Sequence, residues 1–207
     1  MDGPGGTPSD GDRGARRVDD AFLAQPRRGF LPASVRGQAP LDQPLPIGFG
    51  QTNSQPTTVR EMLHLLDVRP GMRVLEVGSG TGWVVALLAE LVGAEGSVLG
   101  TERIARLVES GATNLRTAGV PWARMTEARD DALGAPDEAP FDRILVSAMA
   151  DKVPRELVAQ LAPGGVMVAP VRGRMLRIVR GLPPHDDPAD AVTTEHGLYR
   201  FVPLIVP

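Results

Sequence analysis

The part of the sequence with the clearest chemistry is a glycine-rich turn that follows an apolar segment. Residues 74–77 are apolar apart from Glu76, and the turn then consists of Gly78, Ser79, Gly80, Thr81 and Gly82. Glycine permits the positive φ of a tight turn and lets the backbone approach a ligand closely. A strand, such a turn and a helix in succession are typical of dinucleotide sites and of S-adenosylmethionine sites.

Two carboxylates favour S-adenosylmethionine over a dinucleotide. Glu76 precedes the first glycine of the turn, where its charge would repel a pyrophosphate but attract the cationic methionine end of the cofactor. Glu102 ends the next predicted strand, where a carboxylate accepts the ribose hydroxyls of either cofactor. Asp130 follows the third strand and could reach the adenine amino group, although loop aspartates are common without any ligand.

Alternating strands and helices position these residues. The pattern predicts strands at 73–77, 97–101, 123–127, 141–147 and 165–171, with helices at 82–92, 104–118 and 154–161. Such alternation indicates a parallel sheet that is covered on both faces. Two further strands, at 174–181 and around 199–205, have no helix between them, and we expect them to pair antiparallel. The fold class is therefore α/β, mostly parallel, with antiparallel C-terminal strands.

The first third of the chain is less regular. Residues 1–17 are rich in Gly, Pro, Asp and Arg, and we expect a disordered tail there. A short helical piece at 18–31 and a loop-like stretch at 32–50 follow. Apolar residues at helical spacing predict a helix at 56–66. No internal boundary is visible, so residues 18–207 are expected to form one domain.

Composition narrows the function classes. The chain has 207 residues and a formal net charge of −3, which implies no general basic surface for nucleic acid. It has no cysteine, and its three histidines are scattered, so we expect no metal site. The apolar stretch at 83–94 is too short to span a bilayer, and no signal peptide precedes it. We expect a cytoplasmic protein without a membrane partner, and a monomer is the simplest expectation.

With these residues placed, the chain resembles the protein-L-isoaspartate O-methyltransferase family. The most specific match is the segment Leu-Pro-Ile-Gly-Phe-Gly-Gln-Thr-Asn-Ser-Gln-Pro at 45–56, which methyltransferases in general lack. Further matches follow in order at 74–82, 101–103, 139–142, 153–154, 161–165, 169–171 and 200–204. A weaker match, Gln25-Pro26-Arg27 with Phe30, lies near the start. The resemblance extends from about residue 20 to the end of the chain.

The resemblance implies a doubly wound, Rossmann-like sheet of seven strands in a variant order. It implies that S-adenosylmethionine is converted to S-adenosylhomocysteine while the free carboxylate of an L-isoaspartyl residue in a damaged protein is methylated. The ester then collapses to a succinimide. The resemblance also implies a substrate-side cap at 18–70 and a cofactor-binding core at 71–207. It adds Arg103 to the cofactor residues, and the substrate side would include Ile47, Gly48, Gln51, Thr52, Asn53, Gln55 and Pro56.

Ser54 aligns with the active-site serine of the family. By itself, a serine two residues before Pro56 fits a helix N-cap, whereas the resemblance turns its hydroxyl toward the substrate. A sulfonium methyl group is already activated, and a carboxylate with a pKa of ~4 is ionised at neutral pH. No general base is required, so the problem is one of alignment. We expect Ser54 to donate a hydrogen bond that orients one carboxylate oxygen while the other attacks.

Several departures from the family pattern leave the substrate open. Pro40 stands where the family usually has an aromatic residue, and Thr57 where an aromatic residue or histidine is common. Arg129 and Asp131 replace the glycines that flank Asp130. An alternative is a dedicated aspartyl methyltransferase that makes an aspartimide in a ribosomally synthesised precursor peptide. A nicotinamide oxidoreductase is a further alternative, which Glu76 and the 45–56 segment disfavour. A non-catalytic binding module is another.

Overall fold

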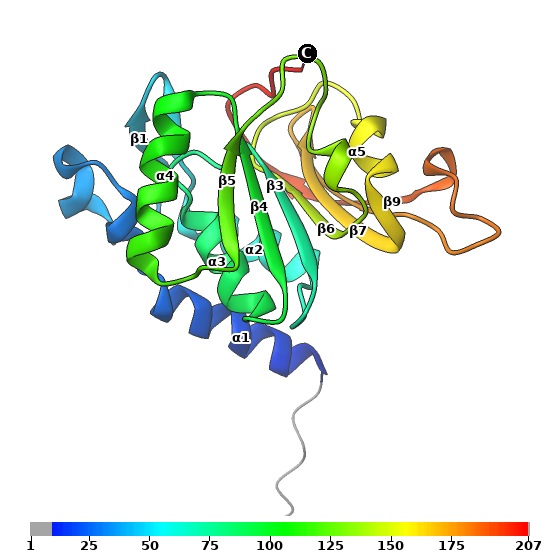
Figure 1. Cartoon of the computed structure of the whole chain (residues 1–207), viewed down its shortest axis with the longest axis horizontal. Coiled ribbons are helices and arrows are strands. Elements are labelled where there is room, and N and C mark those ends of the chain that lie inside the picture. Colours follow the sequence, from blue (N-terminus) through cyan, green and yellow to red (C-terminus); the bar gives the residue numbers. More distant parts are fainter. Residues whose placement is uncertain (1–9, 207) are drawn as a thin grey trace, which may run out of the picture.

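The computed structural model describes residues 10–206, which form a central seven-stranded sheet with helices on both faces (Figure 1). The strand order is β5-β4-β3-β6-β7-β8-β9. Strands β3 to β7 are parallel, whereas β8 and β9 pair antiparallel. The strands are β3 (Arg73–Val77), β4 (Ser97–Glu102), β5 (Ala123–Glu127), β6 (Phe141–Val146), β7 (Leu161–Val171), β8 (Arg174–Val179) and β9 (Val192–Leu198). The α/β fold with antiparallel C-terminal strands is thereby confirmed.

Two apolar clusters cover the two faces of this sheet. One contains buried residues of the first four α-helices packed on inward side chains such as Val74 and Leu145. The other lies on the opposite face, where α5 covers side chains such as Leu75 and Ile144. Alternation along β3 and β6 therefore fills both clusters, as expected for a doubly covered strand. These helices are α1 (Asp10–Ala24), α2 (Pro56–Leu66), α3 (Trp83–Val92), α4 (Ala105–Ala118) and α5 (Arg155–Ala159).

A β-hairpin precedes α2 where the sequence predicted a loop. Strands β1 (Leu45–Gly48) and β2 (Gln51–Asn53) pair antiparallel across a turn at Phe49. Proline and glycine concealed this hairpin, because both residues are usually depleted in strands. Two 3₁₀ turns, Arg27–Phe30 and Ala33–Gln38, connect α1 to it.

The predicted tail at 1–17 is too long, because α1 begins at Asp10. Arg17 donates a hydrogen bond to the carbonyl oxygen of Val68 at 3.1 Å, and Val18 and Ala21 are buried. These tertiary contacts stabilise a helix whose local composition gives little sign of it. Residues 1–9, the rest of the predicted tail, lie outside the described residues.

The last predicted strand, around 199–205, is also wrong. The antiparallel edge strand is β9 (Val192–Leu198), and its polar, largely exposed residues give no apolar pattern. The chain after it returns to the loop that follows β6. There Met149 N donates to Val202 O, and Leu204 N donates to Met149 O, both at 2.7 Å. The apolar residues 201–205 therefore cover the carboxyl end of the sheet instead of extending it.

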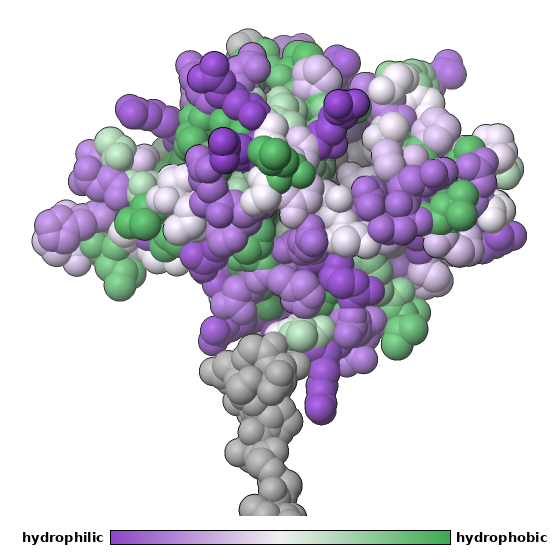
Figure 2. Space-filling view, turned by 180° about the vertical axis from the view of Figure 1, so that it is seen from behind, coloured by the Kyte–Doolittle hydropathy of each residue, from purple (hydrophilic) through white to green (hydrophobic). Residues whose placement is uncertain are grey.

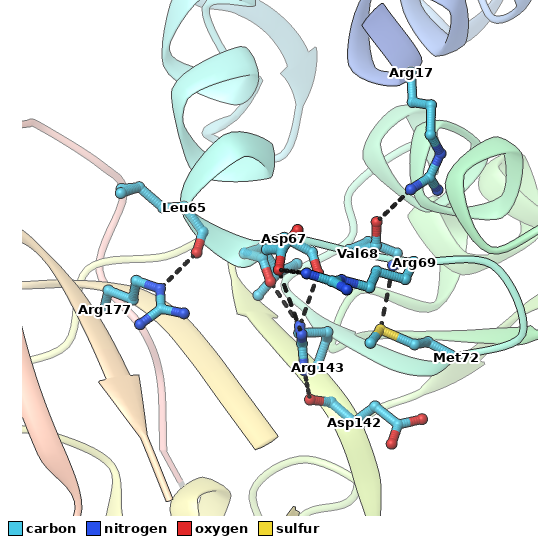
Figure 3. Close-up of polar contacts among 10 residues, drawn as sticks. Arg17, Leu65, Asp67, Val68, Arg69, Met72, Asp142, Arg143 and Arg177 are labelled. Carbon is cyan, nitrogen blue, oxygen red and sulfur yellow. Dashed lines mark hydrogen bonds and ion pairs between the residues drawn. The ribbon is translucent and has the colours of Figure 1, made fainter. Parts of the chain in front are cut away.

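Arginines bind the carbonyl groups at the C-terminal end of α2 (Figure 3). Arg143 Nε on β6 donates to Leu66 O at 2.7 Å, and Arg177 Nε on β8 donates to Leu65 O at 2.9 Å. The last carbonyls of a helix lack partners within the helix, so these bonds satisfy them and fix α2 on the sheet. The other end of α2 begins two residues after Ser54, and its placement therefore matters for the site.

The view from behind in Figure 2 shows hydrophilic and hydrophobic residues interspersed over this face of the molecule. Within residues 10–206, no helix combines the length and the apolar character needed to cross a membrane.

Candidate active site

The glycine-rich turn lies between β3 and α3, below the hairpin. The amide groups of Gly78 and Ser79 donate to Thr101 O at 2.9 and 3.1 Å, which ties the turn to β4. Gly80 has a φ of 54°, and a Cβ atom there would lie 3.0 Å from Cδ1 of Ile47 on β1. The left-handed φ favours glycine at position 80, and a Cβ atom there would crowd the end of the Ile47 side chain, so glycine suits the close approach of the hairpin.

Glu102 reaches this turn from the end of β4. Its Oε2 accepts a hydrogen bond from Gly80 N, and its Oε1 accepts one from Ile104 N, both at 3.0 Å. The residue is only 7% exposed. Each carboxylate oxygen still has a free acceptor position, so Glu102 can accept ribose hydroxyls while it holds the turn in place.

A cavity of about 290 Å³ adjoins the turn and gathers most of the predicted cofactor residues. Predicted residues that line it are Gln51, Thr52, Gly78, Gly80, Glu102, Arg103 and Asp130. The residues 202–206 and Ser147, which the sequence analysis did not select, line it too.

A smaller pocket adjoins this cavity, and the two share Thr52, Gly78, Gly80 and Ser147. The predicted residues that line the smaller pocket are Ile47, Thr52, Asn53, Ser54, Glu76, Gly78, Ser79, Gly80 and Thr81. The fold therefore brings the predicted catalytic serine and the predicted methionine-binding carboxylate to one pocket.

Glu76 lies almost wholly inside the protein, at 1% exposure. Its Oε1 accepts a hydrogen bond from Ser147 Oγ at 2.7 Å, but its Oε2 and the nearby Thr81 Oγ1 have no partner among the described residues. Burial raises the pKa of Glu76 to about 8; the hydrogen bond from Ser147 opposes this shift, and the charge of Glu102 adds to it. An unpartnered buried carboxylate oxygen is costly. A cationic ligand such as the ammonium group of a bound amino acid would satisfy it, so these residues fit the expected cofactor.

The N-cap interpretation of Ser54 is wrong. Gln55 occupies the N-cap position of α2 without a side-chain cap. The exposed carboxylate of Asp42 takes that place, accepting hydrogen bonds from Thr57 N at 2.9 Å and Thr57 Oγ1 at 2.8 Å. The hydrogen bond from the Thr57 backbone is the main reason why the pKa of Asp42 lies below its usual value. The Ser54 hydroxyl has no hydrogen-bond partner within residues 10–206 and stays available for a ligand.

Some predicted residues support the site without lining it. Gly48, Gln55, Pro56 and Gly82 line neither the cavity nor the smaller pocket. Gly48 belongs to the hairpin, Pro56 begins α2 and Gly82 caps α3. Gln55 Nε2 donates to Asp42 Oδ2 at 2.9 Å. Asn53 does line the smaller pocket, but its Oδ1 accepts from Arg27 Nε at 2.7 Å.

Of the two features that sequence reasoning missed, one had a usable signal. Ser147 directly follows β6, the neighbour of β3 in the sheet, and the carboxyl ends of neighbouring parallel strands share one edge. The segment at 202–206 had no such signal, because contacts with residues far away in the sequence, such as its hydrogen bonds to Met149, bring it over the cavity.

The loop that carries Asp130 is cross-linked by its neighbours. Arg129 forms a two-pronged ion pair with Asp131, with N–O distances of 2.8 and 2.9 Å, and a further one with Asp137. Arg129 and Asp131 are the two residues that replace glycines of the family pattern. An ion-paired loop here takes the place of a glycine-rich one beside the cavity.

Proteins of known family resemble this chain over most of its length. The family model described as protein-L-isoaspartate(D-aspartate) O-methyltransferase matches residues 10–206. A protein-L-isoaspartate O-methyltransferase of Methanopyrus kandleri is 44% identical over 191 residues, which cover 92% of this chain and 84% of that protein. A Pyrococcus horikoshii protein of the same name is 40% identical, with 92% of this chain and 86% of that protein covered.

Solved structures agree with the fold. A structure named protein-L-isoaspartate O-methyltransferase has a TM-score of 0.77 at 27% identity, and the match covers 92% of this chain and 61% of that one. A second, from Plasmodium falciparum, is titled a putative protein-L-isoaspartate O-methyltransferase in complex with S-adenosyl-L-homocysteine. It has a TM-score of 0.78 at 22% identity and 93% coverage of both chains.

Proposed function

This chain belongs to the protein-L-isoaspartate(D-aspartate) O-methyltransferase family, and we propose that it methylates the free carboxylate of an L-isoaspartyl residue in a protein or peptide, with S-adenosylmethionine as methyl donor. One observation carries the proposal. The hydroxyl of Ser54 and a buried oxygen of Glu76, which both lack a hydrogen-bond partner within residues 10–206, line the same small pocket, next to the cavity at Glu102.

The cofactor is assigned to the cavity and the small pocket together. Glu76 offers an acceptor and Thr81 a hydroxyl to its amino-acid end, and neither atom has a partner among the residues that the structure describes. Glu102 accepts the ribose hydroxyls, and Asp130 and Arg103 lie toward the adenine. The turn from Gly78 to Gly82, including Ser79 and Gly80, supplies backbone at close range. When bound, the cofactor supplies an activated sulfonium methyl group.

The remaining task of the protein is alignment. Ser54 donates a hydrogen bond to one oxygen of the substrate carboxylate, and the other oxygen forms a bond to the methyl carbon. The carbon–sulfur bond breaks, and S-adenosylhomocysteine is left. Because the attacking carboxylate is already ionised at neutral pH, no side chain has to remove a proton. The resulting methyl ester cyclises to a succinimide.

We further propose that one domain, which α1 extends back to residue 10, carries this activity as a cytoplasmic monomer. Residues 18–70 would form the substrate-side cap, with Ile47, Gln51, Thr52 and Asn53 nearest to the peptide. Residues 71–207 would form the cofactor-binding core. The cap includes the hairpin over the glycine turn, which supports this division.

A dedicated aspartyl methyltransferase acting on one precursor peptide is the second candidate. The departures at Pro40 and Thr57 favour it, because both lie on the segments that flank Ser54. The Thr57 hydroxyl donates to the carboxylate of Asp42. The residue that replaces the family's aromatic residue or histidine is therefore hydrogen-bonded to a neighbour next to the serine.

Substrate choice can be tested with a pair of hexapeptides that differ only in carrying L-isoaspartate or L-aspartate. We expect methyl transfer to the isoaspartyl peptide alone, because its free carboxylate is the group that the family methylates. The transfer is measured by the labelled methyl group that each peptide takes up from S-adenosylmethionine. Activity on the aspartyl peptide, or on neither peptide, would instead favour the dedicated enzyme.

Replacing Glu102 with alanine is expected to weaken S-adenosylmethionine binding by about 10-fold or more, because hydrogen bonds to a charged acceptor contribute roughly 1.5–3 kcal/mol. Isothermal calorimetry measures the Kd. The matched control is Glu109→Ala, which removes an exposed carboxylate from α4. An unchanged Kd in Glu102→Ala would show that the ribose assignment is wrong.

A further inference from the structure

Arg27 is a buried cation that is hydrogen-bonded to the backbone of Ser54. It is 5% exposed. Its Nη2 donates to the carbonyl oxygens of Asn53 and Ser54 at 2.9 and 2.8 Å, and its Nε donates to Asn53 Oδ1 at 2.7 Å. The other arm contacts the segment before the hairpin through Leu41 O at 3.1 Å. One guanidinium group thus joins both ends of the hairpin.

Residues 25–27 also contact the first residue of α3, the helix that follows the glycine turn. The Arg27 guanidinium carbon lies 5.5 Å from the centre of the Trp83 ring. Trp83 is the first residue of α3, immediately after the glycine turn, and its Nε1 donates to Gln25 O at 3.0 Å. Trp83 and Ser54 line the same small pocket. Residues 25–27 therefore link the serine and the glycine turn directly.

The geometry requires an arginine. Burial lowers the pKa of Arg27 to about 10, and the charge of Asp42 opposes this shift, so the group stays protonated at neutral pH. The planar guanidinium group of arginine donates hydrogen bonds to several carbonyl oxygens at fixed angles. A lysine ammonium group is a point charge with three donors.

Asp42 holds the chain on the other side of Ser54. Its carboxylate accepts from Gln55 Nε2 and from both the amide and the hydroxyl of Thr57. Ser54 therefore lies between two charged groups of opposite sign, each bound to its neighbours. The Ser54 hydroxyl itself bonds to neither, and within the described part of the chain it has no other hydrogen-bond partner.

We propose that Arg27 and Asp42 are positioning residues that hold the Ser54 hydroxyl in register with the glycine turn and hence with the methyl group to be transferred. This proposal rests on the role of Ser54 under the proposed function. Neither residue touches the reacting atoms. Their effect passes through the backbone of residues 53–57 and should appear in turnover, while cofactor affinity stays the same.

The test is a double-mutant cycle of Arg27→Lys with Ser54→Ala, with methyl transfer to the isoaspartyl hexapeptide as readout. Arg27→Lys keeps the charge but loses the fork. We expect it to lower kcat about 10-fold, because small misplacements of a positioned group have effects of this size. In the Ser54→Ala background the same change should lower the residual kcat less than about twofold, since coupled residues are non-additive.

Controls separate positioning from general damage. Arg28→Lys changes the adjacent exposed arginine, which donates to Arg36 O, and should leave kcat unchanged. Calorimetry should give Arg27→Lys the wild-type Kd for S-adenosylmethionine. If Arg27→Lys does not fold, Asp42→Ala, an exposed residue, replaces it in the same cycle with the same expected coupling.

Three outcomes overturn the proposal. Additive losses in the cycle, with Ser54→Ala still slow, would reject positioning and leave the proposed function intact. A loss of cofactor affinity equal to the loss of turnover would also reject it. If Ser54→Ala retains full turnover, the proposed role of Ser54 fails first, and the positioning proposal fails with it.

Discussion

Replacing Ser54 with alanine is expected to lower kcat for methyl transfer about 100-fold, while the Kd for S-adenosylmethionine stays the same. The hydroxyl has no partner among the described residues, and Asp42 has taken the helix-capping role that Ser54 might otherwise have filled. Its removal therefore leaves α2 in place and removes only the donor that orients the substrate carboxylate. A loss of alignment in an in-line displacement has effects of this order.

Turnover of the isoaspartyl hexapeptide and calorimetric titration with the cofactor measure the two quantities. Ser110→Ala is the matched control, since Ser110 lies on the exposed side of α4 and its hydroxyl donates to the carbonyl oxygen of Arg106. A melting temperature close to that of the wild type would confirm that the fold is intact. Wild-type kcat in Ser54→Ala would reject the catalytic role of the serine.

The second large effect is expected at Glu76. Changing it to glutamine should stabilise the cofactor-free protein at pH 8 and above by several kcal/mol, because each unit of pKa shift corresponds to about 1.4 kcal/mol. Burial raises the folded-state pKa from an ordinary value of 4.5 to about 8. In such a case the stability is fully present below pH 4.5 and is lost as the pH rises through about 8. Glutamine has no charge to bury, so the advantage of Glu76→Gln grows across that window.

The same substitution should weaken S-adenosylmethionine binding, because the Glu76 oxygen that lacks a partner in the described residues is the one assigned to the ammonium group. Denaturant titrations at pH 5 and pH 8.5 measure the stability difference, and calorimetry measures the Kd. The exposed Glu109→Gln change serves as control for both. A stability difference that does not vary with pH would contradict the raised pKa, and an unchanged Kd would contradict the cofactor assignment.

Most regular elements of the core could be predicted from the sequence. The strands at 73–77 and 123–127 and the helix at 56–66 have the bounds that their patterns indicated. The reason is that strand and helix periodicities, and the glycines between them, are local properties of the chain. The hairpin could not be predicted because proline and glycine, which are depleted in strands, occupy it. The early start of α1 and the path of residues 199–205 could not be predicted, because contacts distant in sequence stabilise both of them.

For the site, the sequence alone determined the chemistry on offer: the glycine turn, Glu76, Glu102 and a serine in a specific segment. Only the tertiary structure decided which of those groups are free to act. Asp42, and not Ser54, caps α2. Ser147 donates to one oxygen of Glu76, and the other oxygen has no partner among the described residues. Arg27 is bound to Ser54 from 27 residues away. Residue types and local spacing are written in the chain, but a hydrogen bond between distant residues depends on how the elements pack, and that packing determines which polar atoms remain for a ligand.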